Sequence, residues 1–461
     1  KKIISAVLVL LALVLGTDHK MGYKAIFYGI AVFFLNGMIY LPFVLLGIER
    51  IWQQRKPGVM ILATCFCALS GYYFFYMIVL AAVLYFVLGE IKRKPGSLKK
   101  AGKDLLAVFL PALSGVLMSS ILLIPSVFGF LASSRGTERV PLSSLFVYSG
   151  TYYKQLITQF LTVTAADDAS TVWYFSMGAL VFIAVMVVFM GERAKKKWWI
   201  LGLGLTILAV CSPFVGYVMN GMGYITNRFM FISAFFMACL VVKMLPEIYR
   251  LNPSQKKRIR IGAVLYGIAA GIAAGKETLI QSAGMILFLI AACVLLSFVK
   301  EEKKLRLALL VLTVGNVIIN GNLMYQPFGA NIQDTYLKAG TVQKQYDRKP
   351  VREAAKASDI TKMERVDVMT DKGYNPNRAV TMRATSHPYL GCSVYYSVVS
   401  GGFSKLMLTL ENSSGLMYSH RLIGMDGRSI LDQLAGVRYV VCRESSMVPY
   451  GFEKKSDTLY E

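Results

Sequence analysis

Charged side chains are scarce in this sequence, and acidic ones are scarcer than basic ones. Of the 461 residues, 16% are charged and 55% are hydrophobic, and 26 Asp and Glu residues stand against 50 Lys and Arg residues. A soluble domain carries about 25% charged residues. The shortage excludes an ordinary soluble enzyme and indicates a protein that lies in a bilayer.

Metal-binding and nucleophilic motifs are also missing. The three histidines form no cluster with cysteines, which argues against a zinc site. The sequence contains no Walker loop, GxSxG elbow or HExxH helix. Most of the seven cysteines lie in apolar runs and act as small hydrophobes. Cys392 and Cys442 lie outside these runs, and the sequence leaves open whether they pair.

Long apolar runs are what the sequence has in abundance. A membrane span needs roughly 20 mostly apolar residues. We predict eleven spans, near 3–16, 24–48, 58–71, 72–89, 104–132, 173–190, 198–218, 226–246, 261–275, 280–299 and 305–323. The predicted fold is a polytopic all-α membrane protein with about 11 transmembrane helices over residues 1–323, followed by a second domain over residues 324–461.

The basic residues gather in alternate loops between these runs. The rich loops are 1–2, 50–56, 90–103, 193–197, 250–260 and 300–306, and the poor ones are 17–23, 133–172, 219–225 and 276–279. This is the positive-inside pattern, so the rich loops face the cytoplasm. The net charge of +24 is then explained by anionic lipid rather than by nucleic acid.

Segment 58–89 decides the topology. Because both of its flanks are basic, we predict a helical hairpin that turns at 70–73. The alternative is one long tilted helix, which would invert every later loop. With the hairpin, an odd number of crossings places the C-terminal domain on the extracytoplasmic side.

The C-terminal domain alternates polar and apolar residues with a period of two. That period predicts strands at 365–369 and 405–410, and a helix at 429–434 precedes a strand at 438–442. We expect an α+β domain. It reaches Glu461 without an obvious closing element, which leaves open whether it continues in a longer chain.

Ionisable side chains are nearly absent from the predicted spans, which argues against a proton-relay pump. Arg228, beside Asn227, stands at the outer end of a span, where a guanidinium can bind phosphate through two parallel hydrogen bonds. Arg135 and Arg139 follow another span and would complete a cationic pocket. The alternative is that these arginines only anchor helices at the interface.

Tyrosines and acidic residues supply the other candidates. Tyr72, Tyr73 and Tyr76 at the hairpin turn, with Tyr152 and Tyr153 in the long outer loop, fit either an interfacial belt or contacts to sugar and lipid.

Outer carboxylates are few. Asp18 is a candidate general base, and Asp167 and Asp168 are candidate ligands of a divalent metal. The alternative for each is a solvated loop residue.

Several segments together resemble bacterial YfhO-type membrane proteins. They are LNGMIYLPFVLLGIER at 35–50, SGYYFFYM at 70–77, NRFMF at 227–231, LAGVRYVV at 434–441 and PYG at 449–451. The resemblance implies a GT-C-like glycosyltransferase of the bacterial cytoplasmic membrane. Such an enzyme moves a sugar from a polyprenyl-phosphate carrier to a cell-surface polymer of the teichoic or lipoteichoic acid type.

The resemblance also assigns roles. It favours Arg228, Arg135, Arg139 and Asn227 as groups that bind the donor phosphate, and it places a catalytic acidic residue in the first outer loop. Asp18 lies in such a loop but lacks the family's motif there. The expected partners are the lipid-linked sugar, the polymer acceptor and membrane lipids, and a divalent cation is the one cofactor left open. A transporter or flippase for envelope precursors and a non-catalytic assembly protein are the rival hypotheses.

Overall fold

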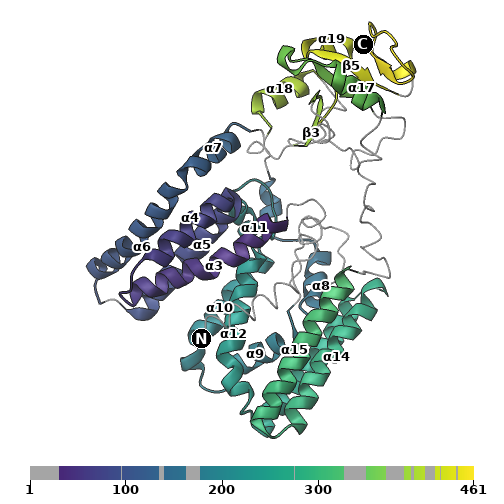
Figure 1. The fold of residues 1–461 in the computed structure, drawn as a ribbon. Helices are drawn as coiled ribbons and strands as arrows, with labels where there is room; N and C mark the ends of the chain where they lie inside the picture. The colour runs from purple at the N-terminus through teal and green to yellow at the C-terminus, as the bar shows by residue number, and fades with distance from the viewer. Residues whose placement is uncertain are drawn as a thin grey trace. The chain divides into compact units, whose positions relative to one another are not determined.

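The computed structural model describes most of the chain. The described residues are 31–94, 96–133, 140–161, 177–274, 276–325, 349–369, 389–395, 399–410, 421–425, 427–442 and 445–461. The chain divides into two compact units, residues 1–124 with 139–335, and residues 125–138 with 336–461. Most helices of both units carry labels in Figure 1, and of the strands β3 and β5 do.

Helices make up the first unit and reach into the start of the second. Their bounds are α3 (Ala31–Trp52), α4 (Gly58–Ser70), α5 (Tyr72–Arg93), α6 (Leu98–Met118), α7 (Ser120–Leu131), the 3₁₀ helix η2 (Leu142–Leu145), α8 (Gly150–Gln159), α9 (Ala179–Val188), α10 (Arg193–Cys211), α11 (Pro213–Met219), α12 (Met230–Ile248), α13 (Pro253–Ala273), α14 (Lys276–Phe298) and α15 (Glu302–Tyr325).

Three described helices, α5, α6 and α12, are long and apolar enough to cross a membrane, and α10 with α11 makes a fourth if that bent pair is one span. The helices α4 and α9 are apolar but shorter. These helices support a membrane protein, while the predicted count of eleven spans and the outward position of the second unit stay predictions.

The α4–α5 pair forms the predicted hairpin, with Gly71 as the only residue between the two helices. A Cβ on Gly47 of α3 would lie 2.9 Å from the Met60 backbone near the start of α4, and a Cβ on Gly37 would lie 3.0 Å from the Phe74 ring near the start of α5. Phe74 follows the end of α4 closely in sequence, so Gly37 lies near the end of α4 and Gly47, later in α3, lies near its start. The helices α3 and α4 therefore run in opposite directions. Small residues such as Gly47 let two helices approach this closely.

Two predicted spans are broken. The run 104–132 is divided between α6 and α7 at Ser119, whose Oγ donates to the Val116 carbonyl at 2.7 Å, a bond that bends helices. The run 198–218 is divided between α10 and α11, which meet at 88°. Proline explains the second break, because Pro213 disfavours a helical conformation at Ser212. Ser212 is extended, with φ −108° and ψ 114°.

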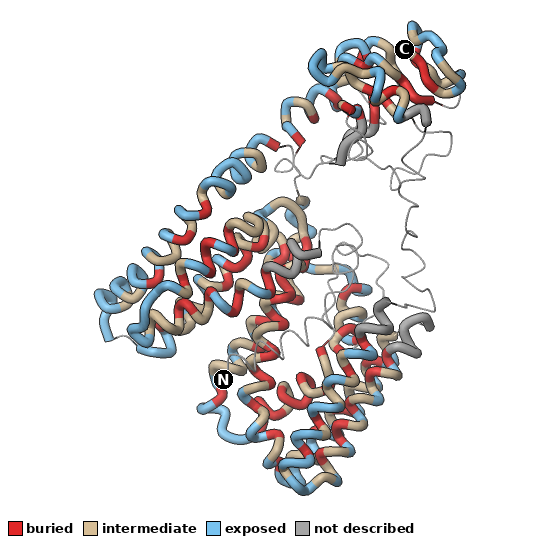
Figure 2. The backbone as a smooth tube through the Cα atoms, viewed as in Figure 1, coloured by how far each residue is buried: buried red, intermediate tan, exposed pale blue. Residues whose placement is uncertain are grey.

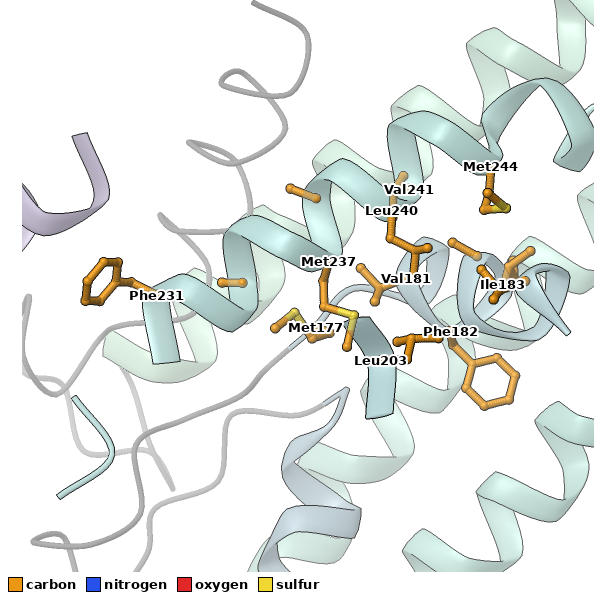
Figure 3. Close-up of a cluster of buried hydrophobic side chains, with 14 of the residues drawn as sticks. Met177, Val181, Phe182, Ile183, Leu203, Phe231, Met237, Leu240, Val241 and Met244 are labelled. Carbon is orange, nitrogen blue, oxygen red and sulfur yellow. The ribbon is translucent and has the colours of Figure 1, made fainter. Parts of the chain in front are cut away.

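The core of the first unit lies where α12 packs against α9 (Figure 3). Ile183 of α9 and Leu240 of α12 are completely buried. The outer faces differ, since α6 buries only Val108 and Gly115 and leaves its other large apolar side chains exposed or half-exposed (Figure 2). A continuous apolar exterior of this kind is typical of a surface that faces lipid.

A buried lysine joins three helices of this core. Lys196 of α10 has a side chain that is only 8% exposed, and its Nζ lies 2.6 Å from Glu247 Oε2 of α12. The same Nζ donates to the carbonyls of Val187 and Met190 at 2.8 and 2.7 Å. A cation at these carbonyls satisfies the end of α9 and opposes its negative dipole end.

The second unit is a small domain of helices and strands. Beyond α7, it contains α17 (Lys349–Ala357), η5 (Ile360–Lys362), β1 (Arg365–Val368), β2 (Leu390–Gly391), β3 (Ser393–Tyr395), α18 (Gly401–Thr409), β4 (Arg421–Ile423), α19 (Ser429–Leu434), β5 (Val437–Val441), η8 (Ser445–Met447) and β6 (Leu459–Tyr460). The main sheet has the order β2-β1-β5-β6, in which β1 is parallel to both neighbours and β6 is antiparallel. The separate pair β3-β4 is antiparallel.

The predicted strand at 405–410 is wrong, because these residues lie almost entirely in helix α18. Its buried residues Ser404 and Met407 are three apart, which is helical spacing. Leu, Met and Lys are strong helix formers, and their chance alternation resembled a strand. The predicted strands at 365–369 and 438–442 and the helix at 429–434 are confirmed as β1, β5 and α19.

Candidate functional site

The candidate site surrounds the short connection between α11 and α12. After α11 the chain makes a tight turn in which Gly221 and Met222 both have positive φ, 64° and 61°. The Met222 amide donates to the Tyr217 carbonyl at 2.9 Å and closes the turn. The chain then runs through Asn227 and Arg228 into α12, so both residues sit directly at a helix start.

Asn227 is completely buried, and both ends of its amide are engaged. Its Oδ1 accepts a hydrogen bond from the Tyr148 hydroxyl at 2.9 Å, and its Nδ2 donates to the Tyr152 hydroxyl at 2.8 Å. The rings of Tyr148 and Tyr152 stack with their centroids 3.9 Å apart. A fully buried amide with two fixed partners is a rigid anchor for the residue that follows it.

Tyr152 and its neighbour Tyr153 also donate hydrogen bonds to the last carbonyls of α10. The Tyr152 hydroxyl donates to the Val210 carbonyl at 2.7 Å, and the Tyr153 hydroxyl donates to the Cys211 carbonyl at 3.0 Å. The last carbonyls of a helix have no partner within that helix. The break that Pro213 imposes therefore creates acceptors, and the start of α8 supplies the donors.

Burial keeps the two stacked hydroxyls protonated. Burial raises the pKa of Tyr148 to about 12, although its hydrogen bond to Asn227 acts in the opposite direction. Burial is also the main cause that raises the pKa of Tyr152. Both phenols therefore stay neutral hydrogen-bond donors at physiological pH.

Arg228 lies over two aromatic rings. Its Cζ is 5.5 Å from the centroid of the Tyr73 ring and 5.9 Å from that of Tyr224. Cation–π attraction at these distances contributes about 0.5–1 kcal/mol at an exposed site and more when the groups are desolvated. Arg228 is half-buried. The rings favour one region of space for its guanidinium.

Hydrogen bonds tie the start of α5 to the same turn. The Tyr73 hydroxyl donates to Asn220 Oδ1 at 2.6 Å, and Asn220 Nδ2 donates to the Tyr224 carbonyl at 2.8 Å. The Tyr76 hydroxyl donates to the Val218 carbonyl at 2.9 Å. The site thus joins α5, the start of α8, the broken α10–α11 pair and the start of α12.

The structure brings together most of the described residues that the sequence singled out. Asn227, Arg228, Tyr73, Tyr152 and Tyr153 belong to one network. Tyr76 is attached to its edge, and Tyr72 opens α5 beside it. Asp18, Arg135, Arg139, Asp167 and Asp168 lie outside the described residues, so the predicted cationic pocket, base and metal ligands stay predictions.

Sequence reasoning missed Tyr148, Asn220 and Tyr224. Tyr148 precedes Tyr152 by four residues, but no helical pattern marks it, because it lies before α8 begins. Asn220 opens the sequence Asn-Gly-Met-Gly, which is a turn signal that could have been used.

No group of three or more His, Cys, Asp or Glu side chains suited to a metal occurs among the residues that the structure describes. Cys392 and Cys442 are both buried, and no disulfide joins them to each other.

Comparison with known proteins supports a bacterial membrane protein. Residues 8–460 match the family described as "Bacterial membrane protein YfhO". The chain is 21% identical over 464 residues to a Bacillus subtilis (strain 168) protein named "Uncharacterized protein YfhO", and the match covers 94% of this chain. The chain spans about half the length of that relative, 50% of it. No solved structure matches the chain significantly. Because the family match covers nearly the whole chain, the protein belongs to the YfhO family of bacterial membrane proteins.

Proposed function

We propose that this protein is a membrane glycosyltransferase that moves a sugar from a polyprenyl-phosphate carrier to a cell-surface polymer of the teichoic or lipoteichoic acid type. The observation that carries the proposal is the position of Arg228, which stands at the start of an apolar helix and over the rings of Tyr73 and Tyr224. A lipid-linked phosphate needs a cation at head-group depth beside an apolar surface for its chain.

The chemistry of the guanidinium fits this role. Its N–H groups all point outward in its own plane, whereas an aromatic ring interacts with the face of the group. The rings hold the cation in place, and a phosphate is bound in the plane of a guanidinium through two parallel hydrogen bonds. A fixed positive charge that stabilises the departing phosphate is a large contribution to transfer.

Asn227 has a supporting role in this proposal. Because both ends of its amide are bound to tyrosines, it positions Arg228. The tyrosine rings of the site offer faces on which a sugar can stack. Asp18 stays the proposed base, Asp167 and Asp168 stay the proposed ligands of a divalent cation, and Arg135 and Arg139 stay proposed phosphate contacts. The proposed location is the bacterial cytoplasmic membrane, with the site and the second unit on the outer side.

The decisive experiment compares three proteins in vesicles that contain a labelled polyprenyl-phosphate sugar. Replacing Arg228 by Ala should reduce sugar transfer at least a hundredfold, and Arg228→Lys should recover only part, because an ammonium lacks the bidentate geometry. The control is Arg258→Ala, which removes one charge from an exposed position on α13. Transfer that survives in Arg228→Ala would refute the proposed role of this residue.

One observation favours a transporter or flippase as the second candidate. The 88° break between α10 and α11 resembles the interrupted helices that line transport sites. The same vesicles distinguish the two functions, because a flippase moves the labelled lipid between leaflets without transferring its sugar. An assembly protein would do neither.

A further inference from the structure

Two carboxylates lie in the interior of the second unit, and the proposed sugar transfer does not use them. Asp367 belongs to β1 and is 3% exposed, and Asp432 belongs to α19 and is completely buried. In the parallel ladder Asp367 pairs with Val440 of β5, so the two side chains share one face of the sheet. Val440 is itself fully buried in an apolar cluster that also contains Leu431, the neighbour of Asp432.

The charges of Asp367 and Asp432 act on Cys392 and on each other, which indicates that the three groups are neighbours. After burial itself, the charges of Asp367 and Asp432 are the next largest causes that raise the pKa of the Cys392 thiol. Asp367 also acts directly on Asp432, because burial first and the Asp367 charge second raise the pKa of Asp432 to about 7. Burial raises the pKa of Asp367 to about 6.

Three of the four carboxylate oxygens lack a hydrogen-bond partner in the part of the chain that the structure describes. They are Asp367 Oδ1 and both oxygens of Asp432. The backbone amides of Val368 and Met425 bind the Asp367 carboxylate. No basic side chain is among the causes that shift the pKa of either aspartate. An unpartnered carboxylate in an apolar interior is strongly unfavourable, so these oxygens are candidates to bind a ligand.

The position of Asp367 in the sheet also favours a bound ligand. β1 lies between β2 and β5 and is parallel to both, so the chain leaves β1 toward one neighbour and later returns on the other side. In open parallel sheets, ligands bind at the carboxyl ends of the strands at this kind of switch point. Asp367 is the third of the four residues of β1 and so lies near its carboxyl end.

The segment that follows β4 lies against the Asp367 carboxylate. Gly424 has a φ of +69°, and a Cβ there would lie 3.1 Å from Asp367 Oδ2. Its amide donates to the Cys392 carbonyl at 3.2 Å. The backbone thus approaches the Asp367 carboxylate closely, which glycine permits in this conformation.

We propose that Asp367 and Asp432 together bind a divalent cation that prefers oxygen ligands, of the Ca²⁺ or Mg²⁺ class. Such ions combine one or two carboxylates with carbonyl oxygens and water. The cation removes the repulsion between the two charges and occupies the unpartnered oxygens. The site is separate from Arg228 and does not depend on the proposed transfer activity.

The test uses the full chain in nanodiscs, freed of metal, with Mn²⁺ as the spectroscopic probe for the site. Electron paramagnetic resonance should detect bound Mn²⁺ that Ca²⁺ or Mg²⁺ displaces. An Asp167→Asn/Asp168→Asn background removes the other proposed cation site, and one Mn²⁺ should remain bound in it. Asp432→Asn and Asp367→Asn should each weaken binding at least tenfold. Asp457→Asn, which alters an exposed carboxylate of the same unit, should bind as the parent does.

A second measurement needs no variant. Because bound metal requires both carboxylates to be ionised, Mn²⁺ affinity of the parent protein should fall at least tenfold between pH 8 and pH 5.5. Equal Mn²⁺ binding by the parent and Asp432→Asn would overturn the proposal. So would a parent protein that binds no Mn²⁺ at pH 8, since the two aspartates would then hold only protons.

Discussion

The hydrogen bond between Tyr148 and Asn227 provides a quantitative test of the candidate site. Replacing Asn227 by Leu removes the acceptor of Tyr148 and the donor to Tyr152 while nearly keeping the side-chain volume. A net hydrogen bond contributes about 1 kcal/mol, and a buried group left unsatisfied costs about 1–3 kcal/mol. We therefore expect Asn227→Leu to lower the free energy of unfolding by about 2–4 kcal/mol.

A double-mutant cycle separates this bond from the rest of the network. Tyr148→Phe alone should cost about 1 kcal/mol, because the Asn227 oxygen loses its donor. In the Asn227→Leu background the same change should cost almost nothing, so the coupling energy should be about 1 kcal/mol. Tyr450→Phe is the control, because Tyr450 is 93% exposed and should be neutral in either background.

The assay is denaturant unfolding of the purified protein in detergent, followed by tyrosine and tryptophan fluorescence. Costs of Asn227→Leu and Tyr148→Phe that simply add would show that the two residues do not interact. Asn227 would then not be held by Tyr148 and would not position Arg228.

Two further predictions concern buried charges elsewhere. Lys196→Met should lower the free energy of unfolding by about 2–3 kcal/mol in thermal unfolding, because it leaves the Val187 and Met190 carbonyls without their donor. The control Lys195→Met removes only an exposed ion pair with Glu192 and should change stability by less than about 1 kcal/mol. Equal effects of the two variants would contradict the buried role of Lys196. In the presence of a chelator, the second unit should lose stability as the pH rises from about 4 to about 7. Folding raises the pKa of Asp432 from 3.8 to about 7, so in this range the folded state holds a proton that the unfolded chain releases. Unfolding at pH 5 and pH 8 should show this loss in the parent and a smaller one in Asp432→Asn, and a stability that rises with pH would refute it.

Much of the local structure follows from the sequence because its causes are local. Run length and apolar content indicated membrane helices, the basic flanks of 58–89 indicated a hairpin, and the structure turns at Gly71 as expected. The strands β1 and β5 and the helix α19 were also predicted. The alternation at 405–410 misled, because a run of six residues fits a strand or a helix equally well, and neighbouring contacts chose the helix.

By itself the sequence determined that this protein is rich in apolar helices and that Arg228 follows Asn227 into one of them, but it predicted a single span over 198–218 where the structure breaks the helix at Ser212. Only the tertiary structure decided which side chains meet. Tyr148 reaches Asn227 across 79 positions of the chain, and Tyr73 reaches Asn220 across 147. Apolar content and helix propensity act over a few residues and carry no information about such partners. The partners were chosen by packing, which brought hydroxyl donors to the carbonyls at the broken end of α10 and buried two aspartates in an apolar interior.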